Sequence, residues 1–400
     1  MIISPDVPAE LQQQLQRPPR WRATAPAELP RVRRDVRDHL MTSQFIAKTI
    51  EKYHHQVATT DPLWFREAPQ RDDQLDLDVL RMLDFEADLL GGAPLYQVDP
   101  DMTLMALNLA ADTPATRLEA DYLPSQSGFA LFEEPIGGFR MRLVDKLGYR
   151  TAQRPIWLDP AATWPVPIVG ASWARGVLDG NDSLRVSFYT PQPENLWARL
   201  PPDTVVAVNR DNGRTTTAGS QARAMQRELQ AEQCAELVWY GQSTVKIGKP
   251  LRSPTLPLYA QPWLQTLYAL FQLHSLGPTT DALGETDLVH VPTSERKRDR
   301  RAGIHDTGHV HVVRLRSRHR TQPAHPANPG RLWGPLEHRH LVGQYRQNKC
   351  LDTHKHQQGT CRHHKDHPVQ GHFKGPQGAP IRWRVNWLTS QGRHHPLTVR

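Results

Sequence analysis

The chain has 400 residues, of which 38% are hydrophobic and 22% are charged, and its formal net charge is +8. This length and apolar content are sufficient for a globular protein with two or three domains. Three cysteines argue against a disulfide scaffold of the secreted type and favour a reducing compartment. The first thirty residues show no signal-peptide pattern, and no window approaches the run of about 18 apolar residues that a membrane span needs. We therefore expect a cytoplasmic protein with no membrane partner.

The first third of the chain has helical patterns. Apolar residues recur three and four positions apart between Val36 and Val57, which predicts one amphipathic helix there. Shorter helices are expected at 77–85 and at 100–111, the second with Pro100 in its first turn. The opening third is therefore predicted to be helical.

Strand patterns follow. Short segments rich in β-branched and aromatic residues lie between turn residues, at 128–134, 166–173, 183–190 and 204–210. Asp179-Gly180 and Asn212-Gly213 can adopt the positive φ that tight hairpins require, so antiparallel pairing is expected. A later helix is predicted at 262–274, and its apolar character on most faces indicates burial.

The last quarter begins with a basic segment, 293–303, which reads as an exposed linker. Beyond it, polar and apolar residues alternate at 309–317, 339–349 and 381–388, which predicts strands. We therefore expect an α+β protein with an antiparallel, strand-rich middle. Its predicted units are a main domain, 1–290, and a small basic β-rich module, 291–400, stapled by zinc.

Charge is divided unevenly between these two units. Residues 291–400 hold 21 Lys and Arg against 6 Asp and Glu, a formal +15, whereas residues 1–290 hold 28 against 35, a formal −7. The same C-terminal residues contain 15 of the 20 histidines. Such asymmetry indicates an anionic partner, most commonly nucleic acid. The alternative is a solvated basic tail.

Arginines recur at every second position after residue 313, and a strand would align them on one face at steps of about 6.6 Å. The predicted nucleic-acid-binding residues are Arg314, Arg316, Arg318, Arg320, Arg382 and Arg384. Four aromatic residues are candidate stacking surfaces for bases, namely Trp333, Tyr345, Trp383 and Trp387. Packing in a small core explains these aromatic residues at least as well.

The stretch 349–367 contains two of the three cysteines and five histidines. Two thiolates and two imidazoles suit a structural, four-coordinate zinc, whose binding free energy would help to fold a module with a thin core. The predicted ligands are Cys350, His356, Cys361 and His363, with His354 or His364 as replacements for either histidine. The spacing is not a standard finger pattern, and a His-rich tract without metal is the alternative. The pairs His309/His311 and His338/His340 would also each project to one face of a strand and could chelate a metal.

Catalytic motifs are incomplete. Segment 241–250 contains Gly-Lys, but it has six residues between its glycines and a proline after the lysine, which a phosphate loop does not allow. Ala174 stands where a nucleophile elbow needs glycine. Cys234 is expected to be a buried apolar residue, and Glu133 and Glu134 are candidate acids by position alone. An enzyme with an unrecognised site in the main domain and a non-catalytic interaction protein therefore remain the alternatives to a nucleic-acid-binding or regulatory protein.

Several segments carry a resemblance to known sequences; they are 59–67, 96–114, 123–138, 168–173, 296–304 and 371–380. Together they resemble a group of uncharacterised proteins from actinobacteria and their mobile elements. The excess of Arg over Lys is typical of such GC-rich genomes. The resemblance implies a host class and one architecture over most of the chain, and it implies no catalytic residue.

Overall fold

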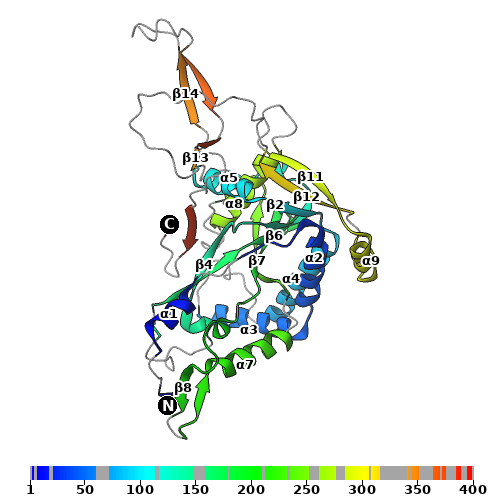
Figure 1. Cartoon of the computed structure of the whole chain (residues 1–400). Helices are drawn as coiled ribbons and strands as arrows, with labels where there is room; N and C mark the ends of the chain where they lie inside the picture. The colour runs from blue at the N-terminus through cyan, green and yellow to red at the C-terminus, as the bar shows by residue number, and fades with distance from the viewer. Residues whose placement is uncertain are drawn as a thin grey trace, which may run out of the picture.

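The computed structural model describes residues 2–3, 7–17, 21–59, 72–112, 117–147, 158–159, 161–178, 180–209, 212–231, 235–251, 261–275, 284–305 and 308–315, followed by six short strands between 340 and 398. The protein is mixed α and β, built around a large mixed sheet (Figure 1).

Seven strands form this central sheet in the order β10-β7-β6-β3-β2-β12-β11. In chain order they are β2 Leu95–Val98, β3 Ser127–Phe132, β6 Gly170–Leu178, β7 Asn181–Pro191, β10 Leu237–Lys246, β11 Gly284–His290 and β12 His309–Leu315. Strands β3, β6, β7 and β10 pair antiparallel, which confirms the expected character of the middle of the chain. Strand β2, by contrast, pairs in parallel with both β3 and β12.

Helices cover both faces of the sheet (Figure 1). Helices α5 (Pro100–Asp112) and α8 (Gln261–Ser275) pack on one face, and α2 (Leu29–Leu40), α3 (Ser43–Thr59) and α4 (Asp72–Gly92) pack on the other. All four residues of β2 are consequently buried: Tyr96 and Val98 join the core on the α5 side, and Leu95 joins the core on the α4 side. A strand with helices on both faces has no solvent side.

The remaining elements form smaller units. One sheet has the order β1-β8-β9, with β1 Ile2–Ile3, β8 Val205–Asn209 and β9 Thr215–Thr217. Another has the order β18-β17-β4-β5, with β4 Gly137–Arg142, β5 Thr163–Ile168, β17 Arg384–Leu388 and β18 His394–Thr398. Two strand pairs join β13 His340–Val342 to β16 His372–Lys374 and β14 Tyr345–Cys350 to β15 His364–Val369. The other α-helices of the described ranges are α1 Ala9–Gln16, α6 Leu143–Lys146, α7 Ala218–Ala231 and α9 Thr293–Arg301.

Most predicted elements are confirmed, but the single helix expected from Val36 to Val57 is wrong. It is two helices, α2 and α3, which separate at Met41 and Thr42. The Thr42 hydroxyl accepts a hydrogen bond from the Phe45 N–H (3.3 Å) and caps a new helix, so the apolar periodicity continues across a break in the backbone. In a similar way, the strand predicted at 166–173 is divided at Val169 into β5 and β6.

Both predicted hairpins are confirmed. Gly180, with φ +73°, lies in the turn between β6 and β7, and Gly213, with φ +63°, lies in the turn between β8 and β9. These positive φ values are the reason why glycine is needed at each turn.

Residues on both sides of position 290 contribute to the same sheets. Strand β12 lies inside the central sheet rather than in a separate module, and β17 pairs in parallel with β4 through Trp387 and Gly138. The division at residue 290 stays a prediction, but strands that follow it extend two sheets of the preceding part. No helix in the described part of the chain is long and apolar enough to cross a membrane.

A buried carboxyl group joins α4 to the central sheet. Glu86 has no exposed surface, and it accepts hydrogen bonds from the hydroxyls of Ser172, Ser187 and Tyr189 on β6 and β7. Burial raises the pKa of Glu86, although these hydrogen bonds oppose the shift. Helix α4 is thus fixed to two strands by a polar contact within an apolar layer.

Replacing Glu86 should flatten the pH dependence of stability. Because the pKa of Glu86 is higher in the folded state than its ordinary value of 4.5, the stability it contributes is complete below pH 4.5 and is lost as pH rises through the folded-state pKa. Urea unfolding at several values between about pH 5 and about pH 8 should therefore show that Glu86→Gln loses less stability than the wild type over this range. Glu51 is exposed, so Glu51→Gln is the control. If the unfolding free energy of Glu86→Gln falls with pH as steeply as that of the wild type, the expectation is contradicted.

Candidate nucleic-acid interface

The segment predicted as an exposed linker is a helix, α9, between β11 and β12. Glu295 lies in its first turn and Arg298, Arg300 and Arg301 lie in its last, as the helix dipole favours. Gly303, with φ +69°, follows its end. The linker prediction was therefore wrong, because charge composition alone does not show that these charges are ordered along a helix.

The two acids of α9 point toward the body of the protein. Glu295 and Asp299 are four residues apart and so share one face of the helix. Asp299 is 2% exposed, and its Oδ2 and Oδ1 accept hydrogen bonds from Arg33 Nη2 (2.8 Å) and Arg34 Nη1 (2.6 Å). Arg34 Nη2 also donates to Glu295 Oε2 at 2.8 Å. Helix α9 is thus held to α2 by ion pairs.

Arg33 is the buried member of this network. Its side chain has no exposed surface, and Nη1 also donates to the Ala93 carbonyl at 3.1 Å. Burial lowers the pKa of Arg33, and the neighbouring Asp299 carboxylate opposes that shift. A buried guanidinium needs such a partner, since an uncompensated buried charge is strongly destabilising.

The opposite side of α9 is basic and exposed. At 3.6 residues per turn, Lys297, Arg300 and Arg301 fall on the face away from Glu295 and Asp299, and all three are exposed. We call these three residues the α9 basic face. Helix α9 stands at the side of the molecule, past the ends of β11 and β12 (Figure 1). This position leaves the basic face accessible to a large anionic partner.

The sequence contained a signal for this arrangement. Two acids with a spacing of four among basic residues indicate a helix with one acidic and one basic face. The basic composition of the segment predicts a linker, whereas the spacing of Glu295 and Asp299 predicts the helix.

Of the six arginines predicted to bind nucleic acid, Arg314 lies on β12. Its Nη1 is 3.2 Å from Asp287 Oδ2 on the neighbouring strand β11, and both side chains are about half exposed. Arg384 begins β17. The remaining four, Arg316, Arg318, Arg320 and Arg382, lie outside the described residues. The predicted row of arginines therefore stays a prediction.

The predicted zinc ligands are only partly within the described residues. Cys350 ends β14 and is paired in the strand register with His364 of β15, one of the two replacement histidines. His354, His356, Cys361 and His363 lie outside the described residues, as does Cys234. In the ranges that the structure describes, no group of three or more His, Cys, Asp or Glu is arranged to hold a metal ion.

The candidate acids Glu133 and Glu134 lie with Asp99 at one end of the inner strands β2 and β3. Glu133 and Glu134 follow β3, and Asp99 follows β2, so the parallel strands bring them to the same end. Burial raises the pKa of Asp99 to about 6 and also raises that of Glu134. Asp99 Oδ1 accepts a hydrogen bond from the Met102 N–H at 2.6 Å, which is the role of a helix cap for α5. Glu133 accepts one from Gln97 Nε2 at 2.9 Å. These contacts are structural and assign no catalytic role.

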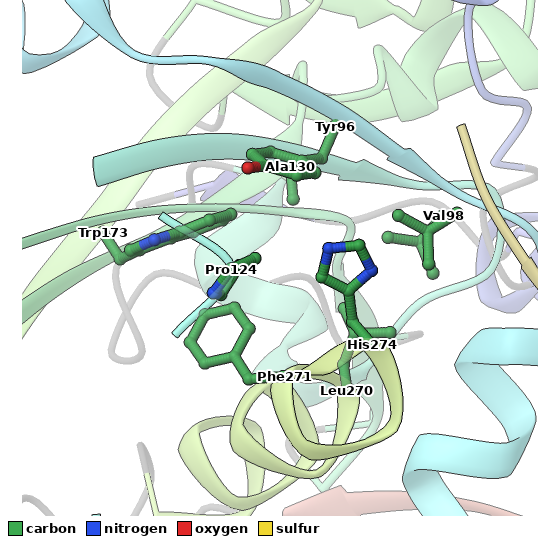
Figure 2. Close-up of a pocket in the computed structure, with 9 residues that line it drawn as sticks. Tyr96, Val98, Pro124, Ala130, Trp173, Leu270, Phe271 and His274 are labelled. Atoms are coloured by element: carbon green, nitrogen blue, oxygen red, sulfur yellow. The ribbon is translucent and has the colours of Figure 1, made fainter. Parts of the chain in front are cut away.

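A hollow between α8 and the central strands belongs to the core. Tyr96, Trp173, Phe271 and His274 are among its lining residues, and the His274 ring points from α8 toward the strands (Figure 2). Its volume of about 10 Å³ holds at most one water molecule. A Cβ atom on Gly128 would lie 2.2 Å from the Trp173 ring, so the neighbouring packing is close. The hollow is too small for an organic ligand.

Comparison with known proteins adds no assignment: no protein-family model matches the chain, and no curated protein or solved structure is significantly similar to it. The relation to actinobacterial proteins stays a prediction.

Replacing Asp299 should destabilise the protein more than replacing Glu295. Asp299→Asn leaves the buried Arg33 charge uncompensated, for which we expect a loss of about 3–5 kcal/mol in the free energy of unfolding. Glu295→Gln leaves Arg34 paired with Asp299 and should cost about 1–2 kcal/mol. Urea denaturation compares the two variants, and equal losses would show that the buried pair does not anchor α9.

Proposed function

We propose that this protein binds nucleic acid through phosphate contacts made by the α9 basic face and by the basic residues that follow β12. The observation that carries the proposal is the sorting of charge on α9. Glu295 and Asp299 are neutralised by Arg34 and Arg33, so the outer face presents positive charge alone. Lysine and arginine side chains on an exposed helix are suited to contact phosphate oxygens.

The composition beyond β12 supports the same partner. Residues 316–400 hold 15 Lys and Arg against 3 Asp and Glu, a formal +12, and 12 of the 20 histidines. A concentration of positive charge on one part of a protein attracts polyanions and raises their association rates. Because phosphate contacts carry no sequence information by themselves, the expected binding is largely independent of base sequence.

Removing the α9 basic face should weaken the salt dependence of binding. Counterion release gives log K a slope of about −0.9 against log salt for each phosphate neutralised on duplex DNA. The triple variant Lys297→Ala, Arg300→Ala and Arg301→Ala should therefore reduce the magnitude of the slope by up to about 2.7. Fluorescence anisotropy of a short labelled duplex, titrated at several salt concentrations, measures this change.

A matched control removes three positive charges elsewhere. Arg214, Arg223 and Arg227 are exposed on or near α7, a helix separate from α9 in the lower part of the view in Figure 1. Their triple Ala variant has the same net charge as the α9 variant, and we expect it to keep nearly the wild-type slope. Equal slopes for the two variants would reject α9 as the contact, and no binding by the wild type at low salt would reject the proposed function.

The proposal includes a structural zinc in the C-terminal residues. The backbone register that sets Cys350 opposite His364 supports it, because cysteine and histidine are the residue types that structural zinc prefers. Zinc would supply folding free energy to strands of only three to six residues.

Zinc content should depend on two of the three cysteines. Purified wild-type protein should contain about one zinc per chain by metal analysis, and Cys350→Ser with Cys361→Ser should lose it. The double variant should also unfold at a lower temperature. Cys234→Ser is the control and should keep the metal. A wild-type preparation made without chelators and without stoichiometric zinc would contradict the site.

A further inference from the structure

We infer that His290 and His309 form a two-histidine chelate for a transition-metal ion such as Zn²⁺ at the base of α9. His290 ends β11, His309 begins β12, and the two are directly opposite in the antiparallel register. Their ring centroids are 4.4 Å apart. This inference does not depend on the proposed nucleic-acid binding.

The backbone places the two side chains close together. The Val291 N–H donates to the Gly308 carbonyl at 2.9 Å, immediately beside the pair. His290 and His309 are therefore a non-hydrogen-bonded pair, the kind of pair in which opposed side chains of an antiparallel sheet are closest. Their relative position is fixed by the strands before any metal binds.

The ring separation is close to that required for joint coordination. Zinc–nitrogen bonds are about 2.0–2.1 Å, so two imidazoles on one tetrahedral ion have ring centres roughly 5 Å apart. The observed 4.4 Å requires an increase of less than about 1 Å, which small side-chain rotations supply. His290 is exposed and His309 is half-buried, so both an ion and water can reach the pair.

The donor set determines the class of ion. Neutral imidazole suits Zn²⁺, Cu²⁺ and Ni²⁺, whereas Mg²⁺ and Ca²⁺ prefer oxygen ligands. His311 is on the same face of β12, but its ring stacks on Tyr96 with centroids 4.9 Å apart. Because no third such donor converges within the described ranges, water completes the coordination, and binding is reversible and weaker than at a four-ligand site.

The metal would join the two strand ends that carry α9. Strand β11 is the outer strand of the sheet, and most of its residues are exposed, so its ladder to β12 is the contact that a metal bridge would reinforce. This pair differs from the sequence-based pairing of His309 with His311, because it links two strands rather than two positions of one strand.

Zinc titration by calorimetry, at about pH 7.5 where imidazole is mostly neutral, tests the site. The wild type should bind one more Zn²⁺ per chain than either His290→Ala or His309→Ala. The double variant should bind the same number of zinc ions as each single variant. His290→Phe keeps a ring without a nitrogen donor and should lose the same ion. The nearby exposed His305→Ala is the control and should bind as the wild type does.

Comparing variants on the full chain separates this ion from any zinc bound at the C-terminal cysteines. Mg²⁺ in place of Zn²⁺ should give no heat from the pair. The inference is overturned if the His290 and His309 variants bind as many zinc ions as the wild type. It is also overturned if His305→Ala loses the same ion, since binding would then not depend on the opposed pair.

Discussion

The buried ion pair between Arg33 and Asp299 determines the orientation of helix α9 and therefore of its basic face. The two residues are 266 positions apart, and the Arg33 side chain has no exposed surface. A guanidinium in that position requires a carboxylate, and Asp299 of the docked α9 supplies it. Docking orients α9, because Glu295 shares the face of Asp299 and pairs with Arg34. The basic residues of α9 are consequently directed to solvent, and the candidate interface follows from a stability requirement inside the fold.

Glu86 is a second directional contact in the helical layer on this side of the sheet. Apolar packing of α2 and α4 against Leu95 and Phe129 is non-directional, so by itself it permits the helices to slide. Glu86 accepts hydrogen bonds from three hydroxyls on β6 and β7, and these directional contacts fix the position of α4 on the sheet. Arg33 has the corresponding role for α2, and the layer is therefore positioned by two buried charged or ionisable groups.

In the unit formed by β11, α9 and β12, one strand lies inside the central sheet and the other lies at its exposed edge. Strand β12 is buried in the sheet beside β2, whereas β11 lies at the outer edge with most of its residues exposed. The basic helix is thus carried by one strand inside the core and one strand at the surface. His290 and His309 lie opposite each other at the base of α9, one on the exposed strand and one on the buried strand. The inferred metal ion would bind there.

The sequence by itself determined the elements whose causes are local. Helices α5 and α8 follow from apolar content and the placement of proline, and the hairpins at Gly180 and Gly213 follow from the φ values that glycine permits. Only the tertiary structure decided that β2 lies in parallel between β3 and β12, and that the acidic face of α9 docks on Arg33 and Arg34 of α2. Arg33 and Asp299 show the physical reason. The free energy of a buried ion pair depends on a partner far away in the chain, and a run of charges has the same composition whether it is solvated or paired.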